Sequence, residues 1–377
     1  MSTNLNTPEL RECCAQKLLA AHEQARGLTA FVGLDGFIDE IVHVVDSRQD
    51  AENFSPIPTI AKLGERIVGA AGKSTNIELV NQVTKLGGNG PIMANALASF
   101  GMKVTYLGAL GYPAMHPVFE EFARTADAHS IAEAGHTDAL EFGDGKLMLG
   151  KMVQLNEVTW KNIQERFGRD RFAAKFGSSD LVAFVNWTML PYMSDLWESL
   201  VGEICPSMGG PRRKIFFDLA DPAKRTPADI SRALNLIIQF EKHFDVILGL
   251  NEKEGNEVAK VFGFSEKVRT PEAISELVRR LHDQLPINTI VIHPVTFALA
   301  VGSAEVSVVE GPFVQKPLIT TGAGDHFNSG FCLGKLLRFD NTMSLLTGVT
   351  TSGHYVRTGR SPTIPQLAEM LRHWPSP

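Results

Sequence analysis

The sequence predicts an α/β fold built on a doubly wound, mostly parallel sheet flanked by helices. Short, almost continuously apolar runs are the first observation, because strands buried on both faces have this pattern. They fall at 29–33, 104–107, 181–185, 215–218, 246–249 and 289–292. Helical patterns separate these runs, an alternation that favours parallel strands joined by helices. The chain has 377 residues, of which 44% are hydrophobic and 21% charged, and such a chain can bury a sizeable core.

The first 28 residues are predicted to form a peripheral helix laid against the main domain, 29–377. Thr7-Pro8 is typical of a helix start, with a capping residue followed by proline at the first helical position. An apolar stripe continues through Leu10, Cys14 and Leu18. We expect one helix from Thr7 to Arg26, which Gly27 ends.

The first strand runs into two acids, Asp35 and Asp39. The carboxyl edge of a parallel sheet is where α/β folds bind ligands, so the pair is a candidate binding site. An Asp-Gly turn followed by a solvated acid is an equally good explanation of the same residues. Spacing alone leaves both interpretations open.

Two further stretches follow the same logic. Gly87-Gly88-Asn89-Gly90 precedes a predicted helix at 92–100, and its glycines allow close backbone approach to a ligand or to a packed neighbour. Asn251 and Glu254 follow the apolar run 246–249. Their oxygens suit a hard cation such as Mg²⁺, and the same spacing is that of a helix cap.

The stretch from Thr320 to Arg338 carries the strongest signal. Gly322-Ala323-Gly324-Asp325 permits a sharp turn, and a helical stripe with Phe327 follows it. Free N–H groups and the dipole at a helix N-terminus favour an anion, so a phosphate would lie beside the Asp325 carboxylate. That arrangement suits transfer of phosphate to a hydroxyl, with Asp325 as general base. The alternative is an Asp cap after a glycine turn. We expect the helix N-terminus to keep Asp325 ionised near neutral pH.

Gly-Ala-Gly-Asp at 322–325 and Asn-x-x-Glu at 251–254 resemble two signatures of the ribokinase-like (PfkB) carbohydrate kinases, and the resemblance extends over about residues 29–366. It implies a ribokinase-like domain with a small β lid near 40–60 and 139–155, where an apolar run and a hairpin pattern occur. It also implies site roles. These are Asp325 as catalytic base; Gly322, Ala323 and Gly324 as anion hole; Asp35, Asp39, Gly87, Gly88 and Asn89 for substrate; Asn251, Thr321, Asn328 and Ser352 for nucleotide; and Asn251 and Glu254 for metal.

The sequence departs from the family pattern at four positions. Ile319 stands where the family has Asp, which affects a monovalent-cation site, and His326 stands where Thr is usual. Val295 and Ala298 replace two glycines of a turn that touches nucleotide phosphates. The end of the chain, 355–365, resembles the family's last strand and turn beside the adenine pocket.

The implied function is ATP- and Mg²⁺-dependent phosphotransfer to a hydroxyl of a sugar or nucleoside. The alternatives are a non-catalytic binding protein of the same fold, or a kinase with ADP as donor or a vitamin as acceptor. A net charge of −6 argues against a nucleic-acid partner. The sequence contains no apolar stretch of about 18 residues, so no membrane span is predicted. The four cysteines and the polar N-terminus favour a cytoplasmic protein. An exposed lid edge would allow a homodimer.

Overall fold

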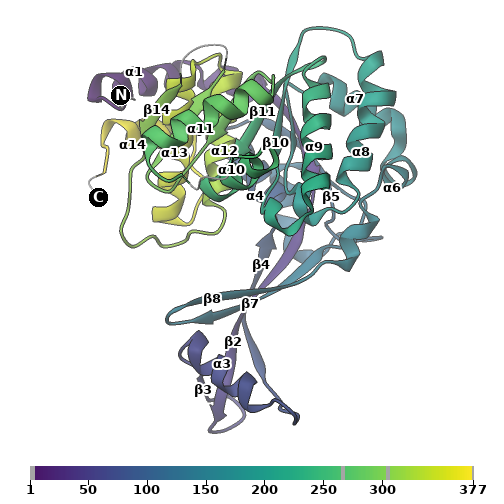
Figure 1. Ribbon diagram of the computed structural model, residues 1–377, viewed down its shortest axis with the longest axis vertical. Coiled ribbons are helices and arrows are strands. Elements are labelled where there is room, and N and C mark those ends of the chain that lie inside the picture. The colour runs from purple at the N-terminus through teal and green to yellow at the C-terminus, as the bar shows by residue number, and fades with distance from the viewer. Residues whose placement is uncertain (1–4, 265–267, 303–305, 376–377) are drawn as a thin grey trace.

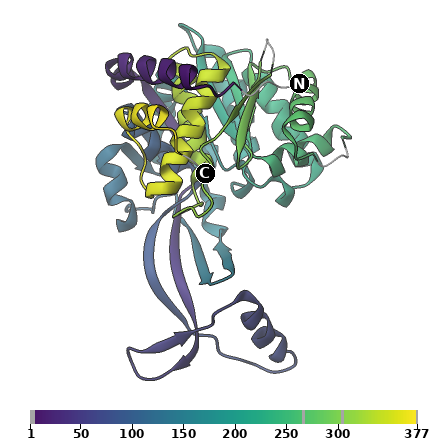
Figure 2. The same cartoon turned by 90° about the vertical axis from the view of Figure 1, so that its left-hand side faces the viewer.

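The computed structural model describes residues 5–264, 268–302 and 306–375. A large sheet carries helices on both faces, and a smaller sheet projects from the body as a long arm (Figures 1 and 2). Within the described part of the chain, no helix is long and apolar enough to cross a membrane.

The large sheet has nine strands in the order β14-β13-β12-β11-β10-β9-β1-β5-β6. The strands from β12 to β6 are parallel, while β13 and β14 are antiparallel additions at one edge. The predicted doubly wound, mostly parallel sheet is therefore confirmed. Its strands are β1 (Thr29–Leu34), β5 (Lys103–Gly108), β6 (Asp127–Ser130), β9 (Leu181–Phe184), β10 (Arg213–Asp218), β11 (Phe244–Leu250), β12 (Thr289–Ile292), β13 (Phe297–Val301) and β14 (Ser307–Glu310).

Successive side chains of the central strands enter two separate cores, one on each face of the sheet. Phe31 belongs to one core and Val32 to the other, as the two-residue period of a strand requires. The first core is covered by α6 (Trp160–Ile163), α7 (Arg169–Ser178), α8 (Met193–Ser199), α9 (Pro227–Phe240), α10 (Glu252–Val261) and α11 (Pro271–Gln284). The second is covered by α1 (Pro8–Ala20), α2 (His22–Gly27), α4 (Asn89–Ser99), α5 (Glu120–Thr125), α12 (Ala323–Leu336), α13 (Asn341–Thr358) and α14 (Ile364–Arg372).

The N-terminal segment differs in part from its prediction. The Thr7 side chain accepts a hydrogen bond from the Leu10 backbone N–H, so the predicted cap is confirmed. The single helix from Thr7 to Arg26 is wrong, because α1 ends at Ala20 and α2 begins at His22. A straight helix of that length would extend about 30 Å. The bend at Ala21 lets Leu18 of α1 and Ala25 of α2 bury against one core.

The smaller sheet contains both segments that were predicted as lid. It consists of β2 (Phe37–Arg48), β3 (Phe54–Pro56), β4 (Leu79–Gly87), β7 (Gly135–Phe142) and β8 (Gly145–Lys151), with α3 (Ile60–Gly69) near its tip. The predicted hairpin joins β7 to β8. The strand β4 was not predicted from the sequence. It pairs with β2 and leads directly into the glycines at 87–90. We call this sheet the arm.

The strand expected near residue 355 is wrong, because 355–358 form the last turn of α13. In the helix, the hydroxyls of Thr347, Thr350 and Thr351 each donate to the carbonyl four residues earlier, so their burial leaves no polar group unsatisfied. Gly359, with φ of 68°, ends the helix. The following turn, 359–363, is where the prediction placed it.

Candidate active site

The carboxyl ends of the parallel strands bring several polar side chains to one edge of the sheet. Asp35 follows β1, Asn186 lies just beyond β9, Asp218 ends β10, and Asn251 follows β11. The N-terminus of α12 approaches this edge, since Asn328 and Asp325 contact groups on it. This edge is the ligand-binding position of open α/β sheets.

The predicted glycine turn and helix start at 322–325 are confirmed. Gly322 is the residue before α12, and its φ of 88° lies in the left-handed region that glycine adopts without strain. Asp325 lies in the first turn of α12 and is only 6% exposed. The Ala323 backbone N–H donates to the Thr320 carbonyl over 3.1 Å, whereas the N–H groups of Gly324 and Asp325 lie in the first turn of the helix, where such groups favour an anion.

The segment 320–326 separates two clefts. The first has a volume of about 560 Å³, and Thr320, Ala323 and Gly324 lie on its wall. The second has a volume of about 420 Å³, and Thr321 and His326 lie on its wall. The turn that carries Asp325 therefore has one face toward each cleft, while Asp325 itself lies buried between them.

Asp325 is held by the glycine-rich segment at the start of α4. The Asn89 amide donates to its carboxylate over 2.9 Å. Burial, and then the charge of Asp218, raise the pKa of Asp325 well above its ordinary value. This direction is opposite to the one that the helix N-terminus favours. Desolvation of a buried carboxylate outweighs the hydrogen bond from Asn89 and the helix terminus.

Asp35 is fully buried, and its carboxylate oxygens are already occupied. They accept hydrogen bonds from the backbone N–H groups of Asn89 and Gly90 and from the Asn186 amide. Tyr106 adds its hydroxyl. Burial raises the pKa of Asp35 to about 6 despite these donors. This geometry supports the segment 88–90 and leaves no free lone pair for the substrate contact that the sequence predicted.

Asp39 faces the second cleft from β2, and it is 7% exposed. Gly87 lies diagonally across on β4, opposite Phe37, and a Cβ there would collide with the Asp39 carboxylate. Burial raises the pKa of Asp39, while a hydrogen bond from Thr137 opposes that rise. Asp39 thus keeps an accessible carboxylate where Asp35 does not.

Asn251 and Glu254 form the helix cap that was one of their two interpretations. The Asn251 side chain accepts from the Glu254 backbone N–H over 2.9 Å, and the Glu254 carboxylate accepts from the Asn251 backbone N–H over 2.8 Å. Burial, followed by the charge of Asp218, raises the pKa of Glu254 well above its ordinary value, and Asp221 and Asp325 act in the same direction. The cap therefore coexists with a group of mutually repelling acids that a cation would stabilise.

Sequence reasoning missed the pairing of Asp218 with Asn328. The Asn328 amide donates to Asp218 over 2.9 Å, and burial raises the pKa of Asp218 to about 6. Asn328 is fully buried, and its contact with the nucleotide stays a prediction. Of the other predicted nucleotide residues, Asn251 and Ser352 line the first cleft, whereas Thr321 lines the second.

His326 supports the turn from behind. One ring nitrogen bonds the Gly322 carbonyl oxygen over 2.7 Å, and the other lies 2.8 Å from the Ser361 hydroxyl. Its ring stacks on Tyr355, whose hydroxyl donates to the Thr321 carbonyl. The departure from the family pattern at His326 thus has a structural role in holding the turn.

The two glycine replacements lie in different surroundings. Val295 is 89% exposed and lines the first cleft, whereas Ala298 is buried in the core beneath β13. The Ala298 side chain therefore takes no room from the cleft, and Val295 adds an apolar surface to its rim.

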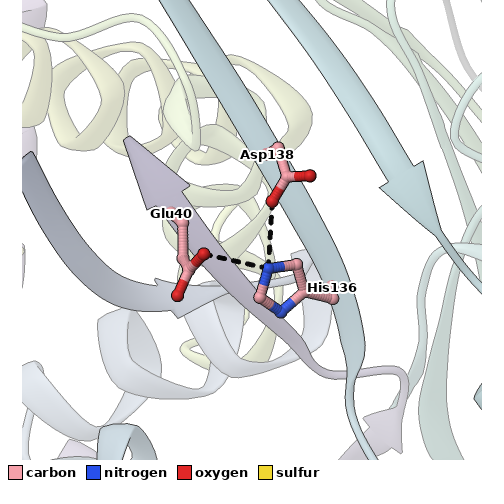
Figure 3. Close-up of side chains that lie close together, drawn as sticks. All are labelled: Glu40, His136 and Asp138. Atoms are coloured by element: carbon pink, nitrogen blue, oxygen red, sulfur yellow. Dashed lines mark hydrogen bonds and ion pairs between the residues drawn. The ribbon is translucent and has the colours of Figure 1, made fainter. Parts of the chain in front are cut away.

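A charged cluster lies in the arm beside Asp39 (Figure 3). His136 Nε2 lies 3.2 Å from the Glu40 carboxylate and 3.1 Å from the Asp138 carboxylate, and Lys151 pairs with Asp138 over 3.0 Å. Successive residues of a strand point to opposite faces, so Glu40 and Asp39 lie on opposite faces of β2. The cluster joins β2 to β7 behind the face that bears Asp39.

Comparison with known proteins identifies the family. The family model for prokaryotic ketohexokinase matches residues 6–374. The chain belongs to the prokaryotic ketohexokinase family. It is 30% identical to a ketohexokinase from Haloferax volcanii over 347 residues, which cover 92% of this chain and 91% of the relative. Membership confirms the predicted ribokinase-like (PfkB) relationship and makes the chain a carbohydrate kinase that transfers phosphate to a sugar.

Solved structures confirm the fold of this ketohexokinase-family chain. A ribokinase from Cryptococcus neoformans in complex with ADP is similar with a TM-score of 0.63 and 18% identity, covering 91% of this chain and 98% of that one. A ribokinase from Arabidopsis thaliana complexed with ribose and ATP also has a TM-score of 0.63, with 15% identity and coverage of 92% and 98%.

Proposed function

We propose that this kinase transfers the γ-phosphoryl group of ATP to a hydroxyl of a ketohexose, in the presence of Mg²⁺, with Asp325 as general base. The observation that carries the proposal is the position of Asp325 on a turn between two clefts. A donor in one cleft and an acceptor in the other would meet at this turn. The name of the Haloferax relative supports a ketohexose as the acceptor.

The first cleft suits the nucleotide. Ala323 and Gly324 line it at the N-terminus of α12, where backbone N–H groups favour phosphate. Phe297, Pro312 and Val349 give it apolar walls farther out, which suit a nucleobase. Gly322, Ala323 and Gly324 would then stabilise the charge that develops on the transferred phosphoryl group. Asn251 and Ser352 stay proposed nucleotide contacts.

The second cleft suits the sugar. Asp39 supplies a carboxylate that can accept hydrogen bonds from hydroxyls, and charge-assisted bonds of this kind are strong. Gly87 gives that carboxylate room, and Asn89 joins the acceptor side to Asp325. We assign Asp35 a positioning role through Asn89 and Gly90, because its oxygens are occupied.

The residues at the sheet edge fit Mg²⁺. Besides burial, the charges of Asp218, Asp221 and Asp325 raise the pKa of Glu254, and the charge of Asp218 raises the pKa of Asp325; a cation would relieve this repulsion. Carboxylate and amide oxygens are the ligands that Mg²⁺ prefers, and it usually keeps several waters. Asn251 and Glu254 would hold it through such waters. When bound, the ion neutralises charge on the phosphates; the protein itself binds the two substrates, excludes water and accepts the hydroxyl proton at Asp325.

Coupled measurement of phosphorylation tests the proposal. Purified protein is offered a panel of ketohexoses, aldohexoses, pentoses, nucleosides and vitamins with ATP or ADP, with and without Mg²⁺. We expect turnover of ketohexoses with ATP only when Mg²⁺ is present. Faster turnover with ADP, or with an acceptor of another class, would contradict the assigned donor or acceptor.

A further inference from the structure

Lys85 of the arm lies directly opposite Asp39. The two are register partners in the antiparallel pair of β4 and β2, so their side chains leave the sheet on the same face. Both line the second cleft, and Lys85 is half-buried there. A cationic side chain therefore stands beside the carboxylate that we assign to sugar binding.

Lys85 makes no hydrogen bond or ion pair with any residue that the structure describes. Its charge nevertheless reaches Asp39, where it lowers the pKa of the carboxyl against the effect of burial. Other lysines of the arm are engaged: Lys146 pairs with Glu141 over 3.0 Å, and Lys151 pairs with Asp138 over 3.0 Å. A half-buried lysine that forms no ion pair with the carboxylate opposite leaves room for a bridging group.

We propose that Lys85 binds the sugar acceptor together with Asp39, the ammonium donating to an acceptor oxygen and the carboxylate accepting from a hydroxyl. This inference rests on the proposed function of the second cleft. An ammonium can only donate and a carboxylate can only accept, whereas a hydroxyl does both. The pair therefore selects a hydroxyl, or two adjacent hydroxyls, at the end of the sugar that points into the arm.

The proposal makes Lys85 a specificity-determining residue. A site built to hydrogen-bond a hydroxyl rejects analogues that lack it, because its own polar groups are then left unpaired. Apolar residues of the same cleft, Leu86 and Ile92, cannot impose that selection. An acceptor without the contacted hydroxyl should accordingly be a poor substrate.

The first experiment compares Lys85→Met with Lys151→Met in steady-state kinetics. Methionine keeps most of the length of lysine and removes the charge. Lys151 is a matched control, because it lies on the opposite face of the arm and its side chain is 60% exposed. For Lys85→Met we expect the KM for the sugar to rise roughly ten- to a hundredfold, the range for losing a charge-assisted hydrogen bond, with the KM for ATP unchanged. Lys151→Met should leave both constants near the wild-type values.

The second experiment uses monodeoxy and deoxyfluoro ketohexoses with wild type and Lys85→Met. Removal of the contacted hydroxyl should harm the wild type strongly and the variant much less, because the variant has already lost that contact. Fluorine cannot donate, so it should abolish the contact with Asp39 in both proteins. A purely structural role for Lys85 would instead give equal losses for every analogue.

The possible outcomes distinguish an error in the proposed acceptor from an error in the proposed role of Lys85. If wild type phosphorylates no ketohexose, the proposed acceptor is wrong. If wild type is active and Lys85→Met keeps its sugar KM, or shows no coupling to any single hydroxyl, the role of Lys85 is overturned. Lys85→Arg keeps the charge and should retain more sugar affinity than Lys85→Met, which excludes a folding defect as the cause.

Discussion

Asp325 is buried at the start of α12, with a single side-chain donor in Asn89. Asp325→Asn should lower the single-turnover rate of phosphorylation by about 10²–10⁴-fold, because the amide cannot accept the proton of the acceptor hydroxyl. Binding of ATP and sugar should remain, since Asn has nearly the same shape. Rapid-quench measurements, with affinities from titration calorimetry, check this. A variant that keeps more than about a tenth of the rate would reduce Asp325 to a helix residue.

The raised pKa values of the buried acids predict how the stability of the metal-free protein depends on pH. Asp35 and Asp218 have pKa values of about 6 in the folded chain, against about 4 when unfolded. Between these values the folded state holds protons that the unfolded state has lost. The free energy of unfolding should therefore fall as pH rises from about 4 through about 6.

Asp218→Asn tests this dependence, because it removes one of these titrating groups while its single amide oxygen can still accept from one of the two present donors, Ala220 or Asn328. We expect a shallower fall in unfolding free energy across that pH range than in wild type. Urea unfolding at several pH values, without metal, measures it. Identical slopes for the two proteins would show that Asp218 does not titrate in this window.

At the scale of single elements, the start of α10 combines a helix cap with the proposed metal site. Glu254→Gln should raise the Mg²⁺ concentration needed for half-maximal activity and leave the unfolding midpoint nearly unchanged, because glutamine also completes a capping box. Glu254→Ala should additionally lose stability, by about 0.5–2 kcal/mol, the range for a lost cap. If Glu254→Gln keeps the wild-type Mg²⁺ dependence, Glu254 serves only as a cap.

The packing of α12 on α13 fixes the turn at 322–325 to the body. Gly334 faces Ser344, and an added Cβ would lie 2.7 Å from the Ser344 Cα. Gly334→Ala should therefore destabilise the protein by about 1–3 kcal/mol, since the two backbones must separate. Gly64→Ala in α3 is the control: a Cβ there meets nothing within 4 Å, so helix propensity should make it neutral or stabilising. The midpoints of denaturant unfolding measure the stability of both variants. Equal effects at both positions would contradict tight packing at α12.

At the scale of the whole molecule, the arm extends away from the body (Figure 2). Its outer strands carry exposed apolar side chains. Val83 on β4 is 53% exposed, and Met148 on β8 is 50% exposed. Strand edges of this kind pair readily with other chains. We expect two copies to associate through their arms.

Val83→Lys combined with Met148→Lys should convert the dimer to a monomer, because charges oppose edge-to-edge pairing. Light scattering coupled to gel filtration measures the mass of both proteins. A wild type that is monomeric at micromolar concentration would refute association through the arm. If the arm also covers the sugar, the variant should have a higher sugar KM with the ATP KM unchanged.

The sequence by itself determined the features that neighbouring residues produce. Apolar runs predicted the strands, Thr7-Pro8 predicted the start of α1, and Gly322 to Asp325 predicted a turn followed by a helix. These succeed because hydrophobic period and backbone freedom are local properties. The strand near 355, which the family resemblance implied, was wrong because α13 continues to Thr358, where Gly359 in a left-handed conformation ends it.

Only the tertiary structure decided how the acids at the sheet edge are used. Asp35 and Asp39 look equivalent in the sequence, yet Asn186, 151 residues away, and Tyr106 occupy Asp35 and leave Asp39 exposed to the cleft. Asn89 meets Asp325 across 236 positions of the chain. Burial, and repulsion between carboxylates that are far apart in the sequence but close in the fold, raise their pKa values, and no local pattern encodes either effect. Chain topology therefore sets the electrostatics of the site, and local sequence supplies the parts.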